Sequence, residues 1–242
     1  MFGLRHAGLM AGGTGSRLRA QGVTTPKPFV RVGGRPVVSY FLDEAAHLGV
    51  TDVSAAVRAD DDEVMTGLAA DRRFEWNFIP TSGEGTFEAV RALSASFAGK
   101  EHLISTCDVV LPIGSLGRLV EAARRTPSRL MTVLGTDLVH DSDPIWIHCH
   151  DADPEVVTGI GKGISASSSV FGNVRWVGEE MWTSMGKLKL SGVKRDTQFM
   201  ATLVSTFPGA VGVYLERDVI DVDDLADLDV AERLVRTWSE HA

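Results

Sequence analysis

The 242-residue sequence predicts an α/β domain built on a mostly parallel sheet, and three observations support this prediction. Short apolar runs, typical of buried strands, alternate along the chain with segments that have helical spacing. A glycine-rich loop follows the first of these runs at residues 12–15, where a ligand loop of an α/β sheet is expected. Hydrophobic residues make up 44% and charged residues 23%, which are ordinary globular values and exclude global disorder.

The individual elements follow from apolar spacing and from the residues that end each segment. In the first half, strands are expected at 8–11, 51–59, 75–80, 102–112 and 129–138, and helices at 37–49, 62–73, 86–98 and 116–125. Between 139 and 195 the pattern loosens, and two strands at 145–150 and 169–178 flank a glycine-rich stretch at 158–163. A helix at 197–207, strands at 210–215 and 219–222, and a helix from about 224 complete the chain.

The net charge and the cysteine content indicate where the protein is located in the cell and which classes of binding partner are excluded. The 24 basic and 32 acidic side chains give a net charge of −8, which argues against a general nucleic-acid or membrane-surface binder. Cys107 and Cys149 cannot form a disulfide framework, and the sequence contains no secretory signal and no apolar run of membrane-spanning length. We therefore expect a cytoplasmic protein with no membrane and no nucleic-acid partner.

The glycine-rich loop carries the strongest functional signal. Gly12, Gly13 and Gly15 allow the backbone to turn sharply and to direct amide N–H groups at an anion, and Arg17 and Lys27 add positive charge nearby. A dinucleotide fingerprint is excluded because leucine stands at position 18, where that motif requires glycine. A P-loop is excluded because the candidate at 156–163 lacks its first glycine and its Ser or Thr.

Three segments together resemble the nucleotidyltransferase family that includes the sugar-1-phosphate nucleotidylyltransferases. They are AGGTGSRL (11–18), TPKP (25–28) and VGGRPVVSYFLDEAAHLGVTDV (32–53), and the resemblance continues more weakly to the C-terminus. It implies a three-layer α/β/α sandwich with a mixed, mostly parallel, Rossmann-like sheet. We expect a single domain over 1–242, with a nucleotide-binding half at 1–138 and an acceptor-binding half, including the C-terminal helix, at 139–242.

The same resemblance implies roles for individual residues. Arg17 would face the leaving pyrophosphate and Lys27 the α-phosphate, and both would be catalytic. Gly85 and Thr86 resemble the family's turn beside the nucleobase, although Thr86 could equally cap the helix that it begins. The remaining nucleotide contacts would be Gly12, Gly13, Gly15 and Ser16 along the phosphates, and Leu9 and Ala11 beside the base.

Two aspartates are the candidate metal ligands. Asp108 follows a buried strand at the edge where ligands bind, and a carboxylate there suits Mg²⁺ shared with phosphate oxygens. By resemblance, Asp221 is the second ligand, and Cys107 replaces the glycine that usually precedes the first. Asp223 remains an alternative to Asp221, and Asp224 is expected to cap the last helix.

Together these features predict a Mg²⁺-dependent nucleotidyltransferase. Its partners would be a nucleoside triphosphate and a small phosphorylated alcohol, of which a sugar 1-phosphate is the main candidate. A cytidylyltransferase acting on a polyol or other alditol phosphate is an alternative, as is a nucleotide-binding regulatory domain without turnover. The sequence leaves open the nucleobase, the acceptor and whether the protein forms a homodimer.

Overall fold

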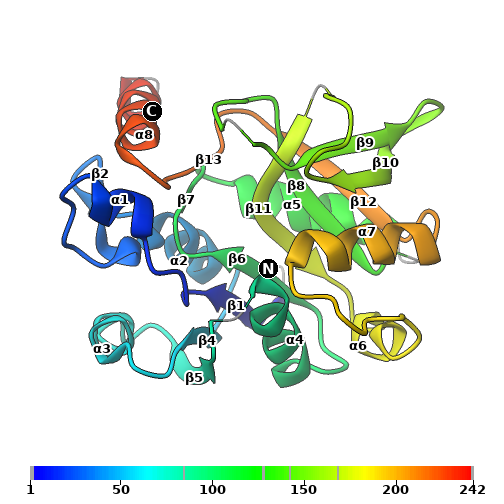
Figure 1. The fold of residues 1–242 in the computed structure, drawn as a ribbon, viewed down its shortest axis with the longest axis horizontal. Coiled ribbons are helices and arrows are strands. Elements are labelled where there is room, and N and C mark those ends of the chain that lie inside the picture. The colour runs from blue at the N-terminus through cyan, green and yellow to red at the C-terminus, as the bar shows by residue number, and fades with distance from the viewer. Residues whose placement is uncertain (1–2, 84, 127–128, 142, 168, 241–242) are drawn as a thin grey trace.

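The computed structural model describes residues 3–83, 85–126, 129–141, 143–167 and 169–240 as a nine-stranded sheet with helices on both faces (Figure 1). The strand order is β5-β4-β1-β6-β11-β8-β12-β10-β9. The strands are β1 (His6–Met10), β4 (Asp52–Arg58), β5 (Glu75–Thr81), β6 (His102–Thr106), β8 (Met131–Thr136), β9 (Trp146–His150), β10 (Asp153–Gly161), β11 (Ser169–Val177) and β12 (Val211–Glu216). Strands β11 and β10 run against the other seven, so the sheet is mixed and mostly parallel, as the sequence predicts.

Helices and two short ladders surround this sheet. The helices are α1 (Ser16–Ala20), α2 (Val38–His47), α3 (Asp62–Ala69), α4 (Thr86–Ser96), α5 (Ser115–Arg124), α6 (Met181–Met185), α7 (Asp196–Thr206) and α8 (Leu225–Glu240), with a 3₁₀ turn η1 at Lys27–Phe29. The ladders pair β2 (Arg31–Val32) with β3 (Arg35–Pro36), and β7 (Val109–Val110) with β13 (Ile220–Asp221). No helix in the described ranges is long and apolar enough to cross a membrane.

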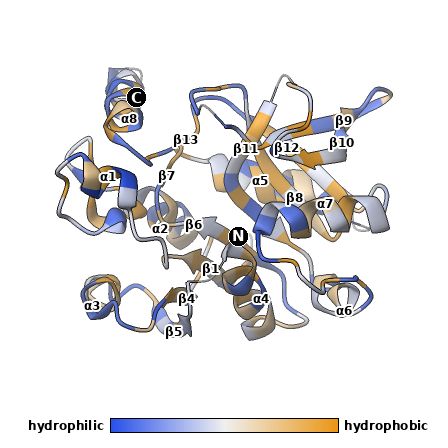
Figure 2. Cartoon of the chain, in the orientation of Figure 1, coloured by the Kyte–Doolittle hydropathy of each residue, from blue (hydrophilic) through white to orange (hydrophobic). Residues whose placement is uncertain are grey.

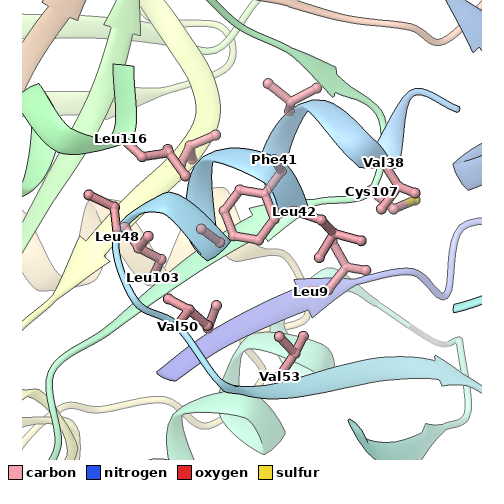
Figure 3. Packing of buried hydrophobic residues seen from close by; sticks show 14 of the residues in the cluster. Leu9, Val38, Phe41, Leu42, Leu48, Val50, Val53, Leu103, Cys107 and Leu116 are labelled. Carbon is pink, nitrogen blue, oxygen red and sulfur yellow. The ribbon is translucent and has the colours of Figure 1, made fainter. Parts of the chain in front are cut away.

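The apolar core lies on the two faces of the sheet, which confirms the three-layer prediction. On one face α2 and α5 pack on the strands, and Phe41 of α2 lies above Leu9 and Leu103 (Figure 3). On the other face α4 and α7 pack together, and the rings of Phe87 and Phe199 stack 5.2 Å apart. Figure 2 shows apolar colour along the central strands and polar colour on the outer loops.

Strand β10 is the main element that the sequence analysis missed. The sequence analysis assigns no helix or strand to the glycine-rich stretch at 158–163, yet residues up to Gly161 belong to the strand. Gly159 pairs with His148 of β9, and the side chains of Val157 and Ile160 are buried in the second core. Pairing with β9, and burial of these two apolar side chains in one core, which the irregular register of β10 allows, outweigh the low strand propensity of glycine.

Candidate active site

The glycine-rich loop leaves the carboxyl end of β1 and borders a cavity of about 340 Å³. Gly15 has a φ of 60°, in the left-handed region that favours glycine, and immediately precedes helix α1. A Cβ atom at Gly12 would lie 3.2 Å from the hydroxyl of Thr81, whereas one at Gly13 would face open space. Gly12 and Gly13 therefore line the cavity, and Gly15 lets the chain turn away from it.

Lys27 lies at the floor of this cavity and connects the loop to two carboxylates. Its side chain is only 10% exposed, and its ammonium group forms ion pairs with Asp108 and Asp223. Burial disfavours the charge of Lys27, but these carboxylates outweigh burial and raise the pKa of the ammonium above its usual range. Arg17 adds a second cation, with a guanidinium nitrogen 3.0 Å from the other oxygen of Asp223.

The β7–β13 ladder brings Asp108 and Asp221 together although they are far apart in the sequence. Asp221 pairs with Val109, and the backbone N–H of Val222 donates a hydrogen bond of 3.0 Å to the carbonyl of Asp108. Ile220 and Val222 are both buried, which turns the alternate residues Asp221 and Asp223 away from the core, as expected for an extended segment. Burial, followed by repulsion from Asp108 and Asp223, raises the pKa of Asp221 to about 7.

These carboxylates fit a divalent cation that is shared with a substrate. One oxygen of Asp108, Oδ1, is buried without a hydrogen-bond partner in the described part of the chain, and burial together with the neighbouring carboxylates of Asp108 and Asp223 raises the pKa of Asp221. Within the same ranges, no three His, Cys, Asp or Glu side chains are placed to hold a metal by themselves. Mg²⁺ commonly takes one or two carboxylates and completes its shell with phosphate oxygens and water, so the donor set is suitable.

His140 and Asp227 support this cluster, and the sequence analysis identified neither. Asp227 accepts hydrogen bonds of 2.9 and 3.0 Å from the N–H groups of Asp223 and Asp224, and its other oxygen lies 3.3 Å from Nε2 of His140. The hydrogen bond with Asp227 raises the pKa of His140. Asp224 caps α8 as expected, by accepting from the N–H of Asp227. Asp224 and Asp227 are three residues apart at the start of a helix, a spacing that resembles a capping box and could have revealed Asp227.

The base-side turn lies across the cavity from the glycine loop. Gly85 and Thr86 both line the cavity, and a Cβ atom at Gly85 would overlap the carbonyl oxygen of Lys194, so only glycine fits. The hydroxyl of Thr86 accepts a hydrogen bond of 2.8 Å from the backbone N–H of Asp196. Arg175, which is 1% exposed, donates two hydrogen bonds to the carboxylate of Asp196. Thr86 therefore ties α7 to the turn rather than capping its own helix.

Leu9, Ala11 and Ser16, the other expected nucleotide contacts, are not among the residues that line this cavity, and their contacts with a nucleotide stay predictions. Leu9 and Ala11 are buried in the core under α2, because alternation along β1 turns their side chains away from the cavity. Met10, between them, lines the cavity instead. Ser16 borders a neighbouring surface depression together with Thr14.

A second cavity of about 230 Å³ lies on the other side of Asp108. Asp108 and Thr106 line both cavities, so the two spaces meet at these residues. Arg17, Asp221 and Asp223 also border the second cavity. Residues 136–173 supply much of the remaining wall, and among them Lys162 forms an ion pair of 2.9 Å with Asp143.

Comparison with known proteins identifies the family. Residues 7–148 match the MobA-like NTP transferase domain. The chain belongs to this family. It is 28% identical over 164 residues to the bifunctional protein GlmU of Leifsonia xyli subsp. xyli, an alignment that covers 66% of this chain and 30% of that protein. It is 32% identical over 98 residues to a glucose-1-phosphate thymidylyltransferase of Streptomyces griseus, covering 40% of this chain and 28% of that protein.

A solved structure extends the similarity of fold beyond these local alignments. The inositol-1-phosphate CTP transferase of T. maritima superposes with a TM-score of 0.78 over 96% of both chains. Sequence identity is 17%, so this similarity establishes a shared fold. The chain spans less than a third of the length of the two curated relatives above.

Proposed function

We propose that this chain transfers a nucleoside monophosphate from a nucleoside triphosphate to a phosphorylated small alcohol, a sugar 1-phosphate, and releases pyrophosphate. The observation that carries the proposal is the meeting of two cavities at Asp108, beside two cations and three carboxylates. One cavity is lined only by residues between 10 and 108, and the other draws on residues from 136 onward. This division supports a nucleotide half at 1–138 and an acceptor half at 139–242.

In the proposed reaction the chain contributes positions and charges. The amides near Gly12 and Gly13 hold the triphosphate, Lys27 contacts the α-phosphate, and Arg17 stabilises charge on the leaving pyrophosphate. The acceptor's phosphate oxygen attacks the α-phosphorus, and the bond to the pyrophosphate oxygen breaks. Because that oxygen is already anionic, no protein nucleophile or general base is required.

Asp108 and Asp221 are the residues that would hold Mg²⁺. When bound, the ion supplies positive charge for the phosphate oxygens of the reaction centre. Lys162 is the cation of the acceptor half that borders the second cavity, and we assign it to the acceptor's phosphate. Its ion pair with Asp143 opens when that phosphate binds.

Two other functions differ from the proposed one in the substrate used or in the absence of turnover. A cytidylyltransferase that uses a polyol or other alditol phosphate is one alternative, and an inositol-1-phosphate CTP transferase shares the fold. A regulatory domain that binds a nucleotide without turnover is disfavoured because Arg17, Lys27, Asp108 and Asp221 are gathered at one place.

A thermal-shift panel of ATP, CTP, GTP, UTP and dTTP with Mg²⁺ tests nucleotide binding. A ligand at 100 times its Kd stabilises the native state by about 2.7 kcal/mol, which for a chain of this size is roughly 5–10 °C. We expect such a shift with one or two of the five nucleotides, and its loss in the Lys27→Ala variant. No shift with any nucleotide would contradict the proposed function.

A further inference from the structure

Strand β11 carries a bulge at the point where it borders the second cavity. Phe171 pairs with Gly135 and Arg175 with Val133, so four steps along β11 correspond to two steps along β8. On the opposite side of β11, the ladder with β6 extends only as far as the pair Val174–Ser105. The strands separate beyond this pair, and Thr106, the next residue of β6, lines the cavity. A bulge of this kind redirects side chains and commonly occurs beside functional sites.

Asn173 lies within the bulge in an unfavourable backbone conformation. Its φ is 58°, in the left-handed region, and in the described ranges only one other non-glycine residue, Asp218, has a positive φ. Asparagine tolerates this conformation better than most residues but still at a cost relative to glycine. Strain of this type persists where surrounding structure imposes it, and it is frequent at ligand sites.

Two polar side chains beside the bulge have no hydrogen-bond partner among the residues that the structure describes. Asn173 lines the second cavity, and its amide has no hydrogen-bond partner in the described part of the chain. The hydroxyl of Thr106, which lines the same cavity, is buried and also lacks a partner there. A buried hydroxyl is normally satisfied, so the unpaired Thr106 hydroxyl, beside the half-buried Asn173 amide, points to a polar ligand in this cavity.

We propose that Asn173 determines acceptor specificity by hydrogen bonding to a hydroxyl group of the acceptor, an inference that rests on the proposed function. Lys162 borders the same cavity and is assigned to the acceptor's phosphate, which leaves the Asn173 amide for the rest of the molecule. An amide offers both a carbonyl acceptor and NH₂ donors, so it can bind a hydroxyl in either direction. The acceptor class is therefore a phosphate ester that carries at least one further hydroxyl group, such as a sugar or cyclitol phosphate.

The substitution Asn173→Gly separates this role from a structural one. Glycine accepts the observed φ without strain, so thermal stability is expected to stay unchanged or to rise. Loss of the amide is expected to raise KM for the acceptor about 10-fold to 100-fold, while KM for the nucleotide stays unchanged. Asp218→Gly is the matched control: it relieves a φ of 61° at a residue outside the cavity, and neither KM should change.

The assay is pyrophosphate release with the five common nucleoside triphosphates and with glucose 1-phosphate, mannose 1-phosphate and inositol 1-phosphate as acceptors. An unchanged acceptor KM in Asn173→Gly would overturn the specificity role and leave the proposed function standing. A parallel rise of both KM values together with lower stability would also overturn it, because that pattern indicates a structural role. If the wild-type protein releases no pyrophosphate from any pair, the proposed function itself fails, and the inference fails with it.

Discussion

Replacing Lys27 with methionine should weaken the folded state as well as the reaction, because Lys27 is the main counter-ion of the carboxylate cluster. The side chains of Lys27 and Asp108 are 10% and 9% exposed. Removing one partner of a buried ion pair costs about 3–5 kcal/mol. Asp223 is partly exposed and keeps Arg17, so we expect the lower end, about 3 kcal/mol. For a chain of this size that loss lowers Tm by roughly 6–12 °C.

The assay is urea unfolding in EDTA for four proteins: wild type, Lys27→Met, Asp108→Asn and the double variant. Loss of the Lys27 ammonium leaves the buried carboxylate of Asp108 without a counter-ion, and Asp108→Asn removes that unpaired charge. The double variant should therefore recover at least half of the stability that Lys27→Met loses. Pyrophosphate release should fall by about two to four orders of magnitude in Lys27→Met. Wild-type stability of Lys27→Met, or strictly additive losses in the double variant, would refute the counter-ion role.

Three further predictions concern buried charge. Arg175→Met breaks the ion pair with Asp196 and should cost about 3–5 kcal/mol in denaturant unfolding, and wild-type stability would contradict this. Burial lowers the pKa of His102 to about 4. The contribution of neutral His102 to the free energy of unfolding is therefore fully present above pH 6.5 and is lost, by about 3 kcal/mol, as the pH falls to 4. His102→Gln should remove this dependence of stability on pH. Because the pKa of Asp221 is raised to about 7, its charge costs stability as pH rises from 4 to 7. Asp221→Asn should therefore be more stable than wild type at pH 8. It should also lose more activity than Asp223→Asn, and the reverse order of activities would make Asp223 the metal ligand in place of Asp221.

The sequence predicts well those features that depend on neighbouring residues. Apolar runs and helical spacing identify most strands and helices, because each pattern reports burial of one local face. The glycine loop and Lys27 are within 15 residues of one another, and Asp108 follows directly from the end of a buried strand. The sequence around each of these residues is therefore enough to predict where it lies in the fold.

The features that the sequence does not predict depend on distant partners. Lys27 and Asp223 are 196 residues apart, and the bond between Thr86 and Asp196 spans 110 residues. The side chain of Leu9, a residue expected beside the base, packs in the core under α2, and alternation along β1 brings Met10 to the cavity instead. The bulge at Asn173 arises from a register mismatch between β11 and β8, and although Gly172 inside the strand is a general signal for a bulge, the size of the mismatch depends on the partner strand.

The most direct test of the account is pyrophosphate release measured with nucleotide alone, with nucleotide plus acceptor phosphate, and with the same pair in Asp108→Asn. If the two cavities that meet at Asp108 hold the two substrates, wild-type protein releases pyrophosphate only when both are present, in the presence of Mg²⁺. Asp108→Asn should be at least about 100-fold slower, because the amide removes the charge that serves the cation. Equal release without an acceptor, or an unchanged rate in Asp108→Asn, would contradict the account.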